Sequence, residues 1–225
     1  MAEQLVFNLP LRTAMGREDF FISPENAAAV AGIEAWNTWP FGKMLLVGPK
    51  GAGKTHLAQI WARLAGARVC SAMSLSARGA VDMAEGGALA VEDADRIAAT
   101  PEAEIALFHL HNALAARGAP LLLTARTVPE RWGLTLPDLD SRMRQAGVLR
   151  LAPPDDTLLS AVMMKLAHDR SMPLKPGILR YAVPRIERSF AAAQGFITAL
   201  DSAALVAKRS PGLQMARAIL ADNPR

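Results

Sequence analysis

Short apolar runs alternate with helical patterns through the first two thirds of the chain. Between the first two runs, Leu57, Ile60 and Leu64 recur at helical spacing, which predicts a helix with one apolar face. Strands that alternate with helices build a parallel sheet that helices cover. We therefore predict a three-layer α/β domain whose buried strands are Met44–Val47, Val69–Ser71, Leu89–Val91, Leu121–Thr124 and Val148–Leu151.

The pattern changes on either side of this region. Upstream, Ser23-Pro24-Glu25 predicts the start of a helix that runs to about Trp36, because serine is a preferred N-cap and proline is favoured at the first helical position. Beyond Pro153-Pro154 only helical periods follow. We expect an extended segment over residues 1–22, the α/β domain over 23–152 and a small all-helical domain over 153–225.

Composition and charge narrow the class of protein. Hydrophobic residues make up 51% of the chain and charged residues 20%, which is typical of a soluble globular protein. We identify no apolar run that approaches the roughly 18 residues of a membrane span, and the start lacks the pattern of a secretory signal. We therefore expect a cytoplasmic protein. The net charge of +4 is weak support for nucleic-acid binding, and the single Cys70 excludes an internal disulfide.

A phosphate-binding motif follows the first predicted strand. The segment GPKGAGKT over residues 48–55 fits G-x-x-x-x-G-K-[ST] in full and lies between a predicted strand and a predicted helix. Glycines let backbone N–H groups turn toward phosphates, and the helix N-terminus adds a positive dipole end. We expect an adenine nucleotide with Mg²⁺ here, held by Gly48, Pro49, Lys50, Gly51, Ala52, Gly53, Lys54 and Thr55. Lys54 would reach the β- and γ-phosphates, and the Thr55 hydroxyl would ligate the metal ion.

Carboxylates follow the third predicted strand. Glu92 and Asp93 stand at its carboxyl end, where parallel α/β sheets hold their ligands. Hydrolysis needs an oxygen ligand for Mg²⁺ and a carboxylate that orients water, so we assign Glu92 to the metal and Asp93 to the water. Thr124, at the end of the next strand, is placed to sense the γ-phosphate. A solvated acidic turn that includes Asp95 is the alternative.

Two further segments carry a resemblance. GKTHL at Gly53–Leu57, which adds His56 to the nucleotide segment, and LPDLDSR over residues 136–142 resemble the AAA+ ATPase branch of the bacterial replication initiator DnaA, and more closely its shortened Hda-like regulators. The resemblance implies an AAA+ domain followed by a helical lid. It also implies that Arg142 is an arginine finger that acts on the nucleotide of a neighbouring subunit. The alternative for Arg142 is an exposed helical arginine.

Two differences from the initiator favour a regulator. The chain stops at Arg225, which leaves no room for the helix-turn-helix domain that reads duplex DNA. Only the short stretch Met73–Gly87 stands where the initiator carries an extra helix that engages single strands. We therefore expect no direct sequence-specific DNA binding.

The N-terminal segment offers a peptide motif. QLVFNL over residues 4–9 resembles the hexapeptide with which replication proteins dock on the sliding clamp. Gln4 would supply hydrogen bonds, while Leu5, Phe7 and Leu9 would anchor in an apolar groove. Without the resemblance, the same alternation predicts an edge strand.

The sequence departs from the family pattern at two positions. Glu92 replaces the usual metal-binding aspartate, and Ala191 stands where the lid carries its second sensor arginine. Arg188, one helical turn earlier, is the candidate substitute. If neither residue reaches the phosphates, the chain's own hydrolysis is weak and ADP is the expected resident nucleotide.

These expectations define one main hypothesis and two rivals. The main hypothesis is a regulator that binds adenine nucleotide and the sliding clamp and promotes hydrolysis of the ATP bound to DnaA. The rivals are a self-sufficient ATPase of helicase-loader type and an adaptor in which the nucleotide is structural. The sequence leaves self-association open and predicts no contact with a membrane.

Overall fold

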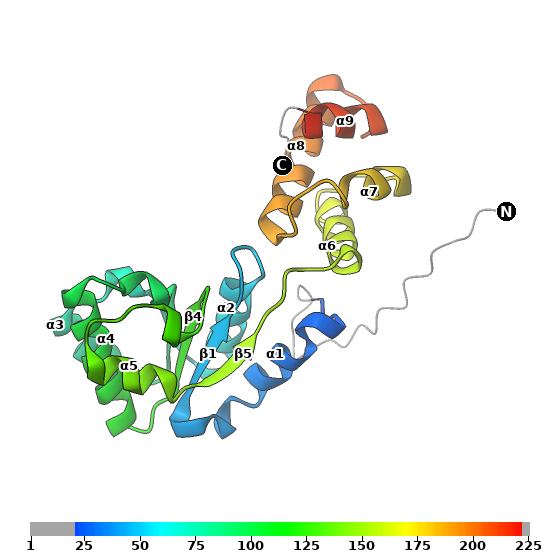
Figure 1. Ribbon diagram of the computed structural model, residues 1–225. Coiled ribbons are helices and arrows are strands. Elements are labelled where there is room, and N and C mark those ends of the chain that lie inside the picture. The colour runs from blue at the N-terminus through cyan, green and yellow to red at the C-terminus, as the bar shows by residue number, and fades with distance from the viewer. Residues whose placement is uncertain (1–20, 222–225) are drawn as a thin grey trace. The chain divides into compact units, whose positions relative to one another are not determined.

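The computed structural model describes residues 21–221 (Figure 1). These residues divide into two compact units, one over residues 28–152 and one from Pro153 onward together with residues up to Ala27. The first unit holds a parallel sheet in the order β2-β3-β4-β1-β5. Its strands are β1 (Lys43–Val47), β2 (Arg68–Ser71), β3 (Leu89–Glu92), β4 (Leu121–Ala125) and β5 (Gly147–Arg150). All five predicted strands are confirmed, each to within one residue at either end.

The sheet is apolar in its middle because β1 and β4 are buried on both faces. Every residue of these two strands is buried. The edge strand β5 alternates between partly exposed and exposed residues, and the edge strand β2 is exposed except at the partly exposed Cys70. Continuous apolar runs are therefore confined to the strands that helices cover on both sides.

Helices lie on both faces of the sheet. They are α1 (Pro24–Glu34), α2 (Lys54–Ala65), α3 (Ala77–Glu85), α4 (Pro101–Ala116) and α5 (Pro137–Arg144). Leu45 and Leu123 share one core cluster with buried residues of α3, α4 and α5. On the other side, Trp61 of α2 stacks on Trp39 with ring centroids 5.2 Å apart. The predicted three-layer arrangement is confirmed.

The first helix begins where it was predicted, but its N-terminal hydrogen bond differs from the expected one. Pro24 is its first residue, and the Ser23 N–H donates to the Asn26 Oδ1 at 2.9 Å. The Ser23 hydroxyl is buried and has no hydrogen-bond partner among residues 21–221. The Asn26 side chain therefore reaches back to the N-cap N–H, while the serine hydroxyl does not make the capping bond that we expected.

The second unit is helical, as predicted. Its helices are α6 (Asp156–His168), α7 (Pro176–Ala182), α8 (Phe190–Ala207) and α9 (Leu213–Ala221). Asp155 and Ser189 cap α6 and α8 by accepting from backbone N–H groups three residues later, at 2.6 and 3.1 Å. A separate apolar cluster, which includes Met163, Phe196 and Leu200, forms the core of this unit.

One expectation about apolar runs is wrong. Helix α8 is long and apolar enough to cross a membrane by length and composition alone. Its buried residues, among them Ala193, Phe196 and Leu200, recur at helical spacing and pack into the core of the helical unit. A helix of this kind in a packed core satisfies the same criterion, so α8 is weak support for a membrane span.

Candidate nucleotide site

The phosphate-binding motif forms a tight loop between β1 and α2, at the carboxyl end of β1. Gly51 and Gly53 have φ angles of +78° and +96°, which side chains other than glycine rarely adopt. At Gly48 a Cβ atom would lie 2.5 Å from the Leu151 carbonyl oxygen. The motif glycines are therefore required by the backbone path and by the approach of β5.

Lys54 lies under the loop as the first residue of α2. Its side chain is buried, and its Nζ donates to the carbonyl oxygens of Gly48 and Pro49 at 2.7 and 2.9 Å. Burial lowers the pKa of Lys54, while the charges of Asp93 and Asp95 act to raise it. The lysine is thus a buried cation that the loop carbonyls and nearby carboxylates hold in place.

Two polar residues of the motif and the residue that follows it are exposed to solvent. Lys50, Thr55 and His56 are exposed, the last two in the first turn of α2. The exposed Thr55 thus lies at the helix N-terminus, where backbone N–H groups and the helix dipole favour an anion.

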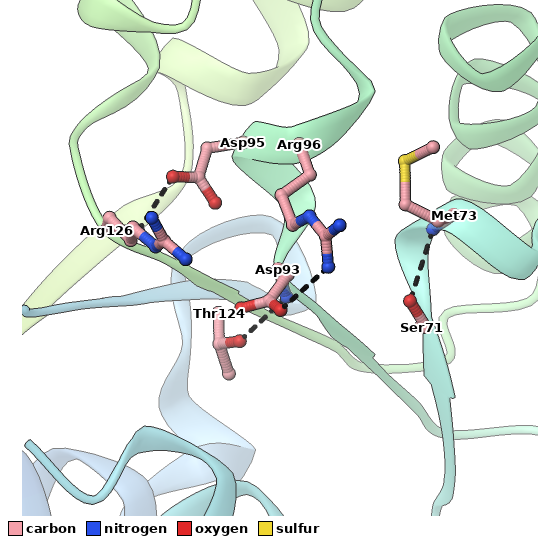
Figure 2. A network of polar contacts seen from close by, with 7 residues as sticks. All are labelled: Ser71, Met73, Asp93, Asp95, Arg96, Thr124 and Arg126. Atoms are coloured by element: carbon pink, nitrogen blue, oxygen red, sulfur yellow. Dashed lines mark hydrogen bonds and ion pairs between the residues drawn. The ribbon is translucent and has the colours of Figure 1, made fainter. Parts of the chain in front are cut away.

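The turn after β3 and Thr124 lie together at the same edge of the sheet, and Figure 2 shows Asp93 beside Thr124. Glu92 ends β3, and Asp93 follows it with a φ of +56°. The Asp93 N–H donates to the Thr124 Oγ1 at 3.1 Å, and Thr124 pairs in register with Leu46 of β1. The carboxyl ends of β1, β3 and β4 therefore assemble the loop, the carboxylates and the threonine in one place.

Unpaired carboxylate oxygens show how this cluster fits a metal-bound nucleotide. Glu92 Oε1 and Asp95 Oδ1 are buried and find no hydrogen-bond partner among residues 21–221. In the same residues, no group of three or more His, Cys, Asp or Glu side chains is arranged to hold a metal ion alone. Magnesium in nucleotide sites takes most ligands from phosphates and water, so one carboxylate and the Thr55 hydroxyl are a suitable protein contribution.

Two charged residues at the site were not assigned a role from the sequence. Asp95 Oδ2 accepts the Arg126 N–H at 3.1 Å, which joins the turn after β3 to the end of β4 (Figure 2). The charge of Arg126 also acts to lower the pKa of Lys54, after the larger effect of burial. Arg126 could have been identified as a site residue from the sequence, because it stands two residues after Thr124 at the same strand end.

Arg142 lies at the opposite end of the sheet from the loop. Its carbonyl oxygen accepts from the Nζ of Lys43, the first residue of β1, at 2.8 Å. The loop follows the last residue of β1, about 13 Å away at roughly 3.3 Å per residue. Figure 1 shows the same path, because α5 leads into the end of the sheet where β5 begins. The exposed Arg142 guanidinium makes no hydrogen bond or ion pair within residues 21–221.

Solved structures with the same architecture include an initiator domain and a DNA motor. Domain III of DnaA from Thermotoga maritima superposes with a TM-score of 0.79 over 92% of this chain and 96% of that chain, at 20% identity. AMPPCP-bound DnaA from Aquifex aeolicus gives 0.66 over 81% of this chain and 63% of that chain, at 18% identity. The Holliday junction branch migration motor RuvB from Thermotoga maritima gives 0.64 over 84% and 63%, at 19% identity. No known family of sequences matches the chain.

The chain has the AAA+ fold. Its five-stranded parallel sheet corresponds to the AAA+ core, and α6 to α9 fit the helical lid that follows such a core. The fold prediction is confirmed. The stretch between β2 and β3 of this AAA+ core contains a short 3-10 helix (Ala72–Ser74) and one α-helix, α3, of nine residues.

Two further predicted positions, Arg188 and Ala191, lie in the helical unit that fits the AAA+ lid. Arg188 pairs with Asp156 of α6, with its guanidinium 2.9 Å from Oδ1, and both side chains are about half exposed. Ala191 lies in the first turn of α8. The clamp-type peptide over residues 4–9, with Gln4, Leu5, Phe7 and Leu9, lies outside the described residues, and so its role remains a prediction.

Proposed function

We propose that this protein is an Hda-like regulator of replication initiation, which binds adenine nucleotide and the sliding clamp and promotes hydrolysis of the ATP held by DnaA. The observation that carries the proposal is the placement of Arg142. Its guanidinium is exposed and unpaired among residues 21–221, and its backbone lies at the end of the sheet away from the chain's own loop. An arginine in that position is available to a second molecule.

The chemistry is phosphoryl transfer to water in the partner's site. An arginine supplied in trans stabilises the charge that develops on the transferred phosphoryl group, and it contributes roughly 10³–10⁵ in rate. The guanidinium of Arg142 would approach the partner's γ-phosphate, while the partner supplies the water and the metal. The acidic first turn of α5, with Asp138 and Asp140, is suited to the N-terminal end of the helix dipole.

The chain's own nucleotide has a different part in this proposal. Lys54 and the loop N–H groups would hold its phosphates, Thr55 and Glu92 would face its Mg²⁺, and His56 would lie beside them in the first turn of α2. Ala191 supplies no charge to the lid, and Arg188 is paired with Asp156. We therefore propose that ADP is the resident nucleotide and that the chain's own turnover is slow. The protein would act in the cytoplasm.

A reconstituted hydrolysis assay tests the function. DnaA preloaded with labelled ATP is mixed with clamp loaded on DNA and with wild type, Arg142→Ala or Arg144→Ala, and conversion of bound ATP to ADP is followed. Arg144 is the matched control, because it lies in the same helix turn but its Nε pairs with Asp140 Oδ2 at 2.7 Å. Wild type and Arg144→Ala should accelerate conversion, and Arg142→Ala should not.

The outcomes separate the rival functions. Equal acceleration by Arg142→Ala would exclude the finger role and favour an adaptor whose nucleotide is structural. Loss of nucleotide binding in Arg142→Ala would make the residue structural.

A self-sufficient ATPase is the second candidate. It is favoured by the cluster of Glu92, Asp93 and Thr124 beside the loop, with its unpaired Glu92 oxygen. Steady-state hydrolysis of ATP by the isolated protein, lost in Glu92→Gln, would support this candidate over the regulator.

A further inference from the structure

Buried charges hold both ends of α5, the helix that carries Arg142. At its start, the fully buried Glu104 of α4 accepts the N–H groups of Thr135 and Leu136 at 2.9 and 2.8 Å, and also the Thr135 hydroxyl at 3.0 Å. At its end, the buried Lys43 donates to the Arg142 carbonyl oxygen at 2.8 Å. An anion at the first turn and a cation at the last turn both match the helix dipole.

Lys43 is itself oriented by a histidine of α4. Its Nζ lies 3.1 Å from the Nε2 of His111, whose Nδ1 lies 3.1 Å from the Asn112 Oδ1. An ammonium group only donates, so Nε2 is the acceptor and Nδ1 carries the ring proton that Asn112 accepts. Burial lowers the pKa of His111, and this favours the neutral ring that the arrangement needs. The lysine therefore has one fixed acceptor on α4 and one on α5.

Stability alone is a poor explanation for a buried ammonium group. Burial lowers the pKa of Lys43, and the charge of Arg142 lowers it further, so the protein holds a cation where its charged form is disfavoured. Burying a charge costs free energy unless excellent contacts offset it, and an apolar side chain of similar volume is often equally stable. What the ammonium group adds is a fixed position for the backbone of Arg142.

We propose that Lys43 is a positioning residue for Arg142: the Lys43–His111 pair fixes the last turn of α5, so that the guanidinium is presented in one direction. This inference rests on the proposed function and names a second residue on which the finger depends. Displacement of a catalytic group by about 1 Å can cost roughly 100-fold in rate. Replacement of Lys43 should therefore lower the stimulated rate about 10- to 100-fold, without loss of assembly.

The test uses the full chain in the DnaA-ATP hydrolysis assay. The variants are Lys43→Met, Arg142→Ala and the double variant, with Lys175→Met as a control, since Lys175 is an exposed lysine at the start of α7. Each is measured for maximal stimulated rate, for the concentration that gives half of this rate, for ADP affinity and for melting temperature. Lys43→Met should lower the maximal rate only, and it should lower the rate no further when Arg142 is already alanine.

The outcomes test the positioning role of Lys43 separately from the proposed function. If Lys43→Met stimulates like wild type while Arg142→Ala does not, the positioning role is wrong and the proposed function stands. If Arg142→Ala stimulates like wild type, the proposed function fails, whatever Lys43 does. An equal loss from Lys43→Met in both backgrounds would also overturn the inference.

A second variant covers the case in which Lys43→Met does not fold. His111→Leu removes the acceptor on α4 and leaves the lysine in place, so it should lower the maximal rate and again have no effect in the Arg142→Ala background. Wild-type stimulation by a folded His111→Leu would overturn the positioning role.

Discussion

The backbone N–H of Asp93 donates to the Thr124 hydroxyl, with 3.1 Å between the two heavy atoms. This bond joins the turn after β3 to the end of β4, and it holds Asp93 in a left-handed backbone conformation with a φ of +56°. Aspartate adopts this conformation more readily than most residues, but at some cost. Thr124 is therefore a structural support for the acidic turn as well as a candidate sensor of phosphate.

Replacement of Thr124 by valine tests this support. Valine has nearly the same shape but accepts no hydrogen bond, so the Asp93 N–H loses its partner. Leaving a buried donor unpaired costs about 1–3 kcal/mol, and Thr124 is almost fully buried. Urea unfolding should give a lower midpoint for Thr124→Val and a nearly unchanged midpoint for Thr124→Ser, which keeps the hydroxyl. Equal midpoints for the two variants would contradict the support role.

Lys54→Ala should remove nucleotide binding. The lysine is the buried cation beneath the loop, and phosphate oxygens would lose the charge that compensates them. Since hydrogen bonds to charged groups contribute about 1.5–3 kcal/mol each, affinity for labelled ADP should fall about 100-fold or more. Arg63→Ala, an exposed residue in the last turn of the same helix, serves as the control and should bind like wild type. Wild-type affinity in Lys54→Ala would refute the assignment of the site.

The N-terminal peptide is predicted to carry clamp binding. Gln4→Ala combined with Leu5→Ala removes the amide and one apolar anchor, and it should abolish retention on purified clamp while ADP affinity stays unchanged. Val6→Ala is a matched control in the same peptide, because Val6 is not among the predicted contact residues. Undiminished retention of the double variant would favour the edge-strand alternative for this segment.

Features that depend on residues close together in the sequence could be predicted. β1 and β4 contain the apolar runs Met44–Val47 and Leu121–Leu123 because both faces of these strands are buried, and the loop of Gly48 to Thr55 follows from a motif with fixed spacing. The fold and the grouping of the loop with Glu92 and Thr124 could be predicted, since the carboxyl ends of parallel strands meet at one edge.

Long-range polar contacts could not be predicted in the same way. Lys43 and Arg142 are 99 residues apart in sequence, and Glu104 and Thr135 are 31 apart. Lysine and glutamate are usually exposed, so no periodic pattern marks them as buried partners of α5. The conformation of Asp93 also had no sequence signal, because it depends on the hydroxyl of a neighbouring strand.

The last prediction concerns pH and His111. Burial is the main cause that lowers the pKa of this ring; the positive charges of Lys43 on β1 and Arg142 on α5 lower it further, and only the hydrogen bond to Asn112 acts to raise it. In the unfolded chain the ring has a pKa of about 6.5. Between that value and the lower pKa of the folded protein, the unfolded state binds one proton more than the folded state, so the free energy of unfolding falls as the pH decreases.

Urea unfolding of wild type and His111→Gln between pH 8 and pH 5 measures this effect. Glutamine does not titrate and can still present an acceptor to Lys43. The carboxylates are common to both proteins, so their contributions cancel in the difference. Wild type should therefore lose more stability on acidification below about pH 6.5 than His111→Gln does. Equal loss in the two proteins would mean that the ring takes up its proton as readily in the folded protein as in the unfolded chain, so that on acidification the Lys43 ammonium would lose its acceptor on α4.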